Sequence, residues 1–203
     1  MMNARGQSKI GVPAFALGAL LATSVMAGGH SPSLEGRYGM TATGACLSSS
    51  VGFTPNNVAI EPSSANSAVN QGILTFRHDG TGSARIFQTQ INLPPAAPAT
   101  FSSSADITFN FTYRMGPEGA MTLDMLLDSY AGTYLTGPRA GLSQTFVTTP
   151  PLSPTWVWSG TYSEDRKVLL LNSGDTLSKL RFSNGAEAYV ICQFGRVLTR
   201  LTP

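Results

Sequence analysis

The sequence predicts an all-β protein, an antiparallel up-and-down β-barrel of about 8–10 strands, with a β-sandwich as the alternative. Apolar and polar residues alternate over residues 106–128, which is the period of half-buried β-strands. The long polar connections between the expected strands would all lie at one end of a barrel. Cys46 and Cys192 would place the first strand beside the last, as barrel closure requires.

Residues 1–27 resemble a bacterial export signal. Arg5 and Lys9 precede a short apolar stretch over 11–22, and small residues then suit a cleavage site. The apolar stretch is too short to cross a membrane as a mature helix. We therefore expect a cleaved signal peptide at 1–27 and a single β-barrel domain at 28–203, exported to the periplasm or the extracellular space.

Apolar runs bounded by turn residues predict the strands in order. They cover 35–47, 73–78, 84–91, the hairpin 106–128, 133–135, 142–148, 155–162, 167–172, 177–182 and 186–194, with a tail over 196–201. Most of these strands run about six to eight residues, near the usual strand length. The first, third and seventh connections are long, at 48–71, 92–105 and 149–154, and the intervening turns are tight. If the strands run up and down, these three loops share one end.

The hairpin 106–128 has a predicted register. A three-residue loop, Pro117-Glu118-Gly119, suits a type I turn followed by a left-handed glycine. The expected opposed pairs are Tyr113 with Leu123, Phe111 with Met125, and Phe109 with Leu127. On the polar face, Arg114 would form a surface ion pair with Asp124, worth less than about 1 kcal/mol.

Two cysteines in an exported protein predict a disulfide between Cys46 and Cys192. On the chain-entropy model, closing so long a loop contributes at most roughly 4–5 kcal/mol. A metal or redox site would need further ligands or a CxxC motif, and the sequence has neither. We expect no metal and no cofactor.

The charge balance points away from polyanionic partners. Removing Arg5 and Lys9 from the 13 Lys+Arg leaves 11, equal to the 11 Asp+Glu. A formally neutral chain has no basic patch for nucleic acid and no attraction to an anionic membrane surface. We therefore expect no nucleic-acid partner and no membrane association.

The start of the first strand carries a resemblance. The chain opens this strand with Gly36-Arg37-Tyr38, and its layout is similar to the lipocalin-like (calycin) barrels, whose first strand begins with Gly-x-Trp. In that family a late Arg packs on the Trp. Tyr38 would stand in for the Trp, and Arg196 or Arg200 for the Arg. The sequence departs from the family in that Tyr, in its strand number and in lacking a C-terminal helix. The resemblance implies small-ligand binding in the barrel and no catalysis.

Catalytic patterns are absent from the sequence. It contains no nucleophile elbow, zinc-protease motif, P-loop or dinucleotide fingerprint. Only His30 and His78 could act as imidazole bases, the first near a chain terminus and the second beside a tight turn. Asp124 and Asp128 would lie roughly 13 Å apart along a strand, beyond the roughly 5–9.5 Å of glycosidase pairs. No catalytic residue is nominated, so we favour a binding function and leave enzymatic activity open.

Aromatic side chains are the candidate ligand-binding residues. Trp156, Trp158 and Tyr162 share one face of the strand 155–162, where Gly160 leaves room, directly after a proline-rich loop. Together with the hairpin aromatics they would line an apolar pocket at the long-loop end. The predicted set is Phe109, Phe111, Tyr113, Trp156, Trp158 and Tyr162. The alternative is that these rings fill a solid core.

Three functions remain open on the sequence. The first is an exported barrel that binds a small lipophilic ligand, or a protein partner through the loops 48–71, 92–105 and 149–154. The second is a non-catalytic structural or protein-interaction module with a solid core. The third is a small outer-membrane β-barrel. Strands of six to eight residues argue against the third, because a membrane strand needs roughly 9–11.

Overall fold

A computed structural model describes residues 33–93, 100–148, 154–173 and 177–201, which belong to one compact unit. Most of them lie in antiparallel strands, joined by turns and one short 3₁₀ helix at Pro117–Gly119. The predicted signal peptide lies outside the described residues. No helix within the described ranges is long and apolar enough to span a membrane.

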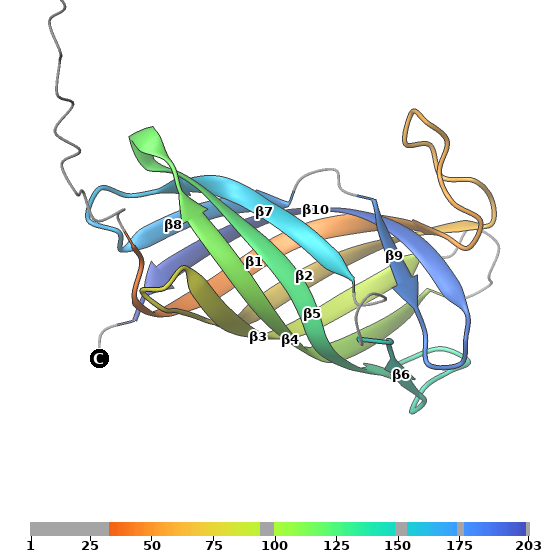
Figure 1. Ribbon diagram of the computed structural model, residues 1–203. Coiled ribbons are helices and arrows are strands. Elements are labelled where there is room, and N and C mark those ends of the chain that lie inside the picture. The colour runs from red at the N-terminus through yellow and green to blue at the C-terminus, as the bar shows by residue number, and fades with distance from the viewer. Residues whose placement is uncertain (1–32, 94–99, 149–153, 174–176, 202–203) are drawn as a thin grey trace, which may run out of the picture. The chain divides into compact units, whose positions relative to one another are not determined.

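The strands form a closed β-barrel, which confirms the predicted fold class (Figure 1). They are β1 (Gly36–Ser49), β2 (Ser63–Phe76), β3 (Thr81–Leu93), β4 (Phe101–Met115), β5 (Ala120–Tyr134), β6 (Ser143–Thr145), β7 (Thr155–Tyr162), β8 (Val168–Ser173), β9 (Ser178–Arg181) and β10 (Glu187–Arg200). The order around the wall is β1-β2-β3-β4-β5-β7-β8-β10, and β10 pairs back onto β1. The closure favours the barrel over the sandwich alternative.

Two positions in the wall are each shared by two strands. One end of β5 pairs with β7 and the other end with β6. In the same way, β10 pairs with β8 near its end and with β9 near its start. A bridge between Phe146 and Phe182 connects the β6 side to the β9 side. The wall therefore keeps eight strand positions along its length.

The register of the central hairpin is as predicted. Tyr113 opposes Leu123, and the two further predicted pairs hold as well. The ion pair also forms, with 3.1 Å between Arg114 Nη2 and Asp124 Oδ2. The turn conformation was predicted incorrectly, because Glu118 also takes a positive φ of 55° beside Gly119. Two consecutive left-handed residues give a turn whose twist matches the flanking strands.

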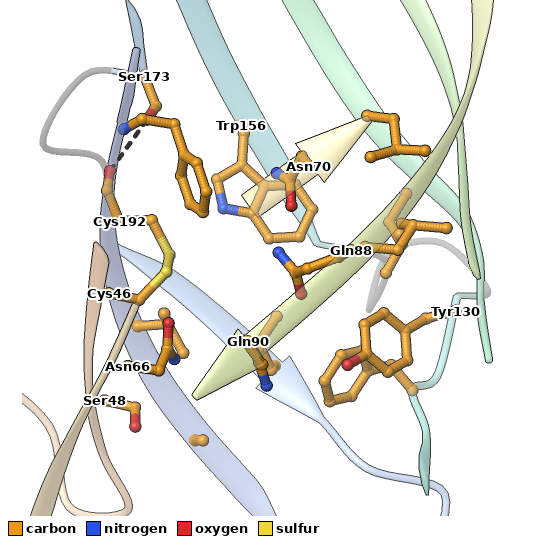
Figure 2. Close-up of a pocket in the computed structure, with 18 of the residues that line it drawn as sticks. Cys46, Ser48, Asn66, Asn70, Gln88, Gln90, Tyr130, Trp156, Ser173 and Cys192 are labelled. Carbon is orange, nitrogen blue, oxygen red and sulfur yellow. Dashed lines mark hydrogen bonds between the residues drawn. A yellow bond between two sulfur atoms is a disulfide. The ribbon is translucent and has the colours of Figure 1, made fainter. Parts of the chain in front are cut away.

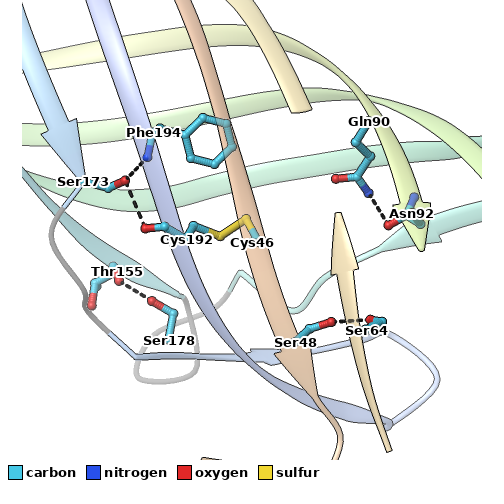
Figure 3. The surroundings of a disulfide bond; sticks show 10 residues. All are labelled: Cys46, Ser48, Ser64, Gln90, Asn92, Thr155, Ser173, Ser178, Cys192 and Phe194. Atoms are coloured by element: carbon cyan, nitrogen blue, oxygen red, sulfur yellow. Dashed lines mark hydrogen bonds between the residues drawn. A yellow bond between two sulfur atoms is a disulfide. The ribbon is translucent and has the colours of Figure 1, made fainter. Parts of the chain in front are cut away.

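The first and last strands lie side by side, and the predicted disulfide between Cys46 and Cys192 is confirmed (Figure 3). The two cysteines are directly opposed across β1 and β10. Beside them, Ser173 Oγ donates to the Cys192 carbonyl at 3.1 Å and accepts from the Phe194 N–H at 2.9 Å. Such a disulfide is compatible with an exported protein.

The strand lengths were predicted incorrectly. Six strands run 13–15 residues, because β2 begins at Ser63, β4 begins at Phe101 and β5 continues to Tyr134. The predicted loops 48–71 and 92–105 therefore contain long stretches of strand. The length argument against a membrane barrel fails with them. The inward positions of these stretches hold Asn, Gln, Ser and Ala, which conceal the apolar period on which the prediction relied.

The tight turns β2–β3, β4–β5 and β7–β8 lie at one end, the closed end, which is packed solid. Phe76 is the centre of an aromatic cluster, with its ring centroid 5.1–5.2 Å from those of Tyr38, Phe111 and Tyr113. The Phe111 ring lies directly on Gly82, where a Cβ would be 2.1 Å from it. The longer connections lie at the opposite end, as predicted.

Residues before β1 close this end of the barrel. The Tyr113 hydroxyl lies 2.6 Å from the Leu34 carbonyl oxygen and 2.7 Å from that of Arg77, and it accepts the Leu34 N–H at 3.0 Å. The Tyr38 hydroxyl donates to the Arg166 carbonyl at 2.7 Å. The buried hydroxyls are thus hydrogen-bonded, and the closed half is a satisfied core.

Candidate functional site

The half of the barrel nearer the long connections, the loop half, contains a cavity of about 210 Å³ (Figure 2). One wall is formed by β1, β2 and β3 and carries polar side chains: Ser48, Asn66, Asn70, Gln88, Gln90 and Asn92. The rest of the lining is mainly aromatic and we call it the aromatic wall: Phe109, Tyr130, Phe146, Trp156, Phe182 and Phe194. The cavity therefore combines a hydrogen-bonding surface with an apolar one.

Strand register explains the polar wall, which we call the amide wall. Asn70 opposes Gln88, and Asn66 opposes Asn92 four residues further along the same strands. Because residues two apart in a strand share a face, all of these amides point inward. Figure 2 shows Asn70, Gln88 and Gln90 directed toward the cavity. The alternation that places apolar residues in the closed half thus continues with amides in the loop half.

The amide wall is only partly satisfied. The side chain of Gln90 donates to Asn92 Oδ1 at 3.4 Å, and Asn92 donates to Ser103 Oγ at 3.3 Å. The Oδ1 atoms of Asn66 and Asn70 are buried and have no hydrogen-bond partner among the described residues. Buried polar atoms normally find a partner in the protein, in water or in a ligand. The wall can therefore offer hydrogen bonds to an occupant of the cavity.

Arg196 lies where the amide-lined half meets the apolar half. Its inward-facing neighbour two residues along β10 is Leu198, a fully buried core residue. Arg196 is 6% exposed, and its Cζ lies 3.8 Å from the centroid of the Trp158 ring. Its Nη1 donates to the Phe194 carbonyl at 3.2 Å, whereas its Nε has no partner among the described residues. Burial lowers the guanidinium pKa to about 9, so the group is a cation at neutral pH.

The predicted ligand-binding residues divide between the two halves. Phe109, Trp156 and Trp158 line the cavity, with the Phe109 ring centroid 5.7 Å from that of Trp156 and 6.1 Å from that of Trp158. Phe111 and Tyr113 belong instead to the aromatic cluster of the closed half. Tyr162 lies at the closed end, where its hydroxyl donates to the Gly116 carbonyl at 3.2 Å. None of these last three side chains is among those lining the cavity.

The two late arginines have different surroundings. Arg200 opposes Tyr38 across β10 and β1. Arg196 stacks on Trp158 of β7 instead. The closed eight-position barrel is compatible with a lipocalin-like fold.

Sequence reasoning missed the amide wall and the role of Arg196 at the cavity. The signal available was a polar period of two, with Asn66, Asn70, Gln88, Gln90 and Asn92 at alternate positions of two neighbouring runs. These runs continue the apolar faces of β2 and β3 in phase. A segment in which polar residues recur at every second position, without apolar residues, looks like a loop. Its strand character is recognised only when the segment is considered together with the strand that it extends.

The rim of the cavity is aromatic. The ring centroids of Tyr130 and Phe146 are 4.2 Å apart, and those of Phe146 and Phe182 are 4.8 Å apart. Burial raises the pKa of the Tyr130 hydroxyl to about 12, so this side chain stays neutral at physiological pH. These rings come from β5 and from the residues flanking β6 and β9, which gives the two short strands a place in the cavity wall.

The described residues contain no group of three His, Cys, Asp or Glu side chains placed to hold a metal ion. His78 is exposed in the turn between β2 and β3 at the closed end, far along the strands from the cavity. The side chains lining the cavity include no Asp, Glu or His. The arrangement offers hydrogen bonds, aromatic surface and one cation.

Comparison with known proteins adds no family assignment. No protein-family model matches the chain, and no match was found among curated proteins or solved structures.

Proposed function

We propose that the barrel binds one small molecule in its loop half, between the amide wall and the aromatic wall. The observation that carries the proposal is a cavity of about 210 Å³ lined by inward-facing amides, two of which, Asn66 and Asn70, have buried oxygens without a partner among the described residues. A module with a solid core would have no use for inward-facing amides, because unsatisfied buried polar atoms are destabilising. A ligand that accepts and donates hydrogen bonds here would remove that cost.

The proposed ligand is compact and amphipathic. Pockets for drug-sized molecules usually measure roughly 300–1,000 Å³, so a cavity of about 210 Å³ suits a smaller molecule. Its polar side would face the amide wall, and its apolar side would contact Phe109, Trp156 and the rim. This differs from the wholly apolar ligand expected from the sequence, because the polar side chains on β2 and β3 were not assigned to the interior.

A water-soluble barrel is favoured over an outer-membrane one by the outer face of β4 and β5. Asp106 forms a two-pronged ion pair with Arg85 on this face, at 2.6 and 3.1 Å, and Arg114 pairs with Asp124 nearby. Lipid-facing charges near the membrane centre cost about 2–4 kcal/mol for Arg or Lys. The apolar closed half is also unlike the polar interior of membrane barrels. The disulfide and the signal-like residues 1–27 support export.

Native mass spectrometry of the protein purified without detergent tests the proposal. We expect an additional mass that is lost on denaturation, or, for protein obtained empty, a fluorescence change of Trp156 and Trp158 on adding a compact amphipathic molecule such as indole, 2-naphthol or octanoate. Ala188 lines the cavity, so Ala188→Phe should reduce the response by filling it. Ala45→Phe is the matched control, because Ala45 is exposed on the outer face of β1.

The result that contradicts the proposal is equally specific. The purified protein would carry no additional mass, and its tryptophan fluorescence would respond to no member of the panel. The Ala188→Phe variant would also be no less stable than wild type. That combination would favour the structural module, since a cavity without a ligand is simply improved by filling.

A further inference from the structure

Arg196 is the one charged side chain that is buried among the described residues. A buried charge normally has an opposite charge or a full set of hydrogen bonds. The ion pairs within the described ranges join other residues, all on the surface. Burial is also the sole cause of the lowered Arg196 pKa, with no contribution from an acidic neighbour. The positive charge therefore lacks an anionic partner in the described part of the chain.

The geometry leaves the guanidinium edge available. A guanidinium carries five N–H donors in its plane, and Trp158 stacks on one face of that plane at 3.8 Å. Stacking uses the face and leaves the donors at the edge. One donor, on Nη1, binds the Phe194 carbonyl, and Nε is buried without a partner among the described residues. The side chain lines the cavity, so the stacked ring holds a cation at the base of the amide wall.

A second unpartnered polar group lies across from it. Ala42 of β1 stands between Arg196 and Asn70, opposing Arg196 on one side and Asn70 on the other. Two strand spacings, roughly 10 Å between backbones, separate the Arg and Asn positions. The Ala42 side chain between them is small and buried. Asn70 is itself buried, and its Oδ1 has no partner among the described residues.

We propose that Arg196, stacked on Trp158, binds the carboxylate of the ligand, and that the side-chain N–H of Asn70 donates to the same carboxylate from the opposite side. The inference rests on the proposed function, because it assigns the chemistry of a ligand in the same cavity. The ligand is then a compact monocarboxylate whose apolar body lies against Phe109 and Trp156.

Three observations select this chemistry. The planar fork of a guanidinium matches the two oxygens of a carboxylate. One cation with no second Lys or Arg among the lining residues balances one negative charge, and a phosphate dianion would be left with a second charge in a buried site. The lining residues in the described part of the chain include no Asp or Glu that would repel an anion. The aromatic wall requires an apolar body, which excludes small inorganic anions as the whole ligand.

Isothermal titration calorimetry with matched pairs of carboxylates and primary amides tests the inference. Suitable pairs are benzoate with benzamide, 2-naphthoate with 2-naphthamide, and octanoate with octanamide, since each pair differs mainly in charge. A hydrogen-bonded charge contributes enough that wild type should prefer the carboxylate by roughly 10- to 100-fold. Arg196→Met should abolish this preference and leave the affinity for the amide within a few-fold. Arg196→Lys should keep part of the preference, and Arg200→Met at the closed end should keep all of it.

The outcomes separate this inference from the proposed function. Equal affinity for both members of a pair, or a preference that survives in Arg196→Met, overturns the carboxylate assignment and leaves a ligand-binding barrel. A co-purified ligand without an acidic group does the same. Absence of binding to every pair, together with an empty native mass spectrum, overturns both.

Discussion

The two halves of the barrel interior are built differently on the same strands. Along β2 the inward positions change from Leu74 and Phe76 in the closed half to Asn66 and Asn70 in the loop half. The closed half has its rings packed edge to face and its tyrosine hydroxyls hydrogen-bonded. The loop half has unpartnered amide oxygens and an unpaired buried cation. The difference indicates that the closed half supplies stability and that the loop half supplies a binding surface.

Removing the disulfide should give the largest loss of stability, and the loss should be greater in the loop half than in the closed half. Cys46→Ala with Cys192→Ala opens a loop of 146 residues in sequence separation, which costs up to about 4–5 kcal/mol in the free energy of unfolding on the chain-entropy model. Because the bond joins β1 to β10 in the loop half, amide hydrogen exchange should rise most around 44–49 and 189–194. Equal loss of protection around Leu123 would contradict the distinction between the halves.

Truncating one side chain in each half should lower the free energy of unfolding by unequal amounts. Leu123 is fully buried in the closed half, and Leu123→Ala should lower the free energy of unfolding by about 2–5 kcal/mol through the cavity that it creates. Gln90→Ala in the amide wall removes a side chain that already borders empty space, and we expect less than about 1 kcal/mol. Urea unfolding followed by tryptophan fluorescence measures both. Similar costs at the two sites would show that the loop half is packed as tightly as the closed half.

The affinity for a carboxylate probe should depend on pH in one direction. Arg196 and Tyr130 are the lining side chains that can titrate, apart from the disulfide-bonded cysteines. The guanidinium pKa of about 9 means that the cation is present at neutral pH and is lost as the pH rises through that value. Tyr130, with its pKa raised to about 12, stays neutral over this range. Affinity for 2-naphthoate should therefore be constant from pH 6 to 8 and fall above pH 9, by roughly tenfold for each further pH unit.

The matched amide is the control for this titration. Affinity for 2-naphthamide should stay unchanged over the same pH range, because no charge on the probe depends on the guanidinium. A parallel decline for both probes would point to loosening of the barrel instead of loss of the cation.

The smallest expected change is in the free energy of unfolding of the Arg196→Met variant without ligand. Arg196→Met removes a buried charge without an acidic partner and replaces it with an apolar side chain of similar length. Such replacements are often neutral or stabilising, so the free energy of unfolding should stay within about 1 kcal/mol of wild type or rise. Thermal and urea unfolding without ligand measure it. A large destabilisation would mean that Arg196 is held for packing on Trp158 and Phe194, and the loop half would then resemble the closed half.

The difference between the apolar closed half and the polar loop half also explains how much of the fold the sequence could predict. Strict alternation at Phe109, Phe111 and Tyr113 was sufficient to predict strands, faces and cross-strand partners, because the inward side chains of the closed half are apolar. The two cysteines were sufficient for the closure. Residues 63–71 and 101–105 were taken for loop, because Asn66, Asn70 and Ser103 at inward positions look the same as solvent-exposed polar residues.

The site itself was predicted only on its aromatic side. A pocket was predicted at Trp156 and Trp158 because these residues follow a long loop. Three of the six aromatic residues in the predicted set, Phe109, Trp156 and Trp158, line the cavity. Arg196 was expected only as one of two arginines that could pack on Tyr38, and its position in the cavity was not predicted, because a single arginine in a strand is ordinarily exposed. Its burial follows from register across β1 and β10, which local patterns do not contain. Sequence reasoning thus failed mainly where the chain departs from the apolar-inside rule, which is where the candidate site lies.

Closure by β10 also has a consequence for how the molecule forms. Arg196, Cys192 and the strand that completes the wall all belong to this segment, and its partner β1 lies at the other end of the domain. During synthesis from the N-terminus, the strands β1–β5 can pair with their neighbours as they emerge, but the two outermost strands meet only once nearly the whole chain exists. Contacts so distant in sequence slow folding. The cavity, the place of Arg196 and the disulfide therefore all depend on the pairing of β1 with β10, and the barrel cannot enclose a ligand until these two strands meet.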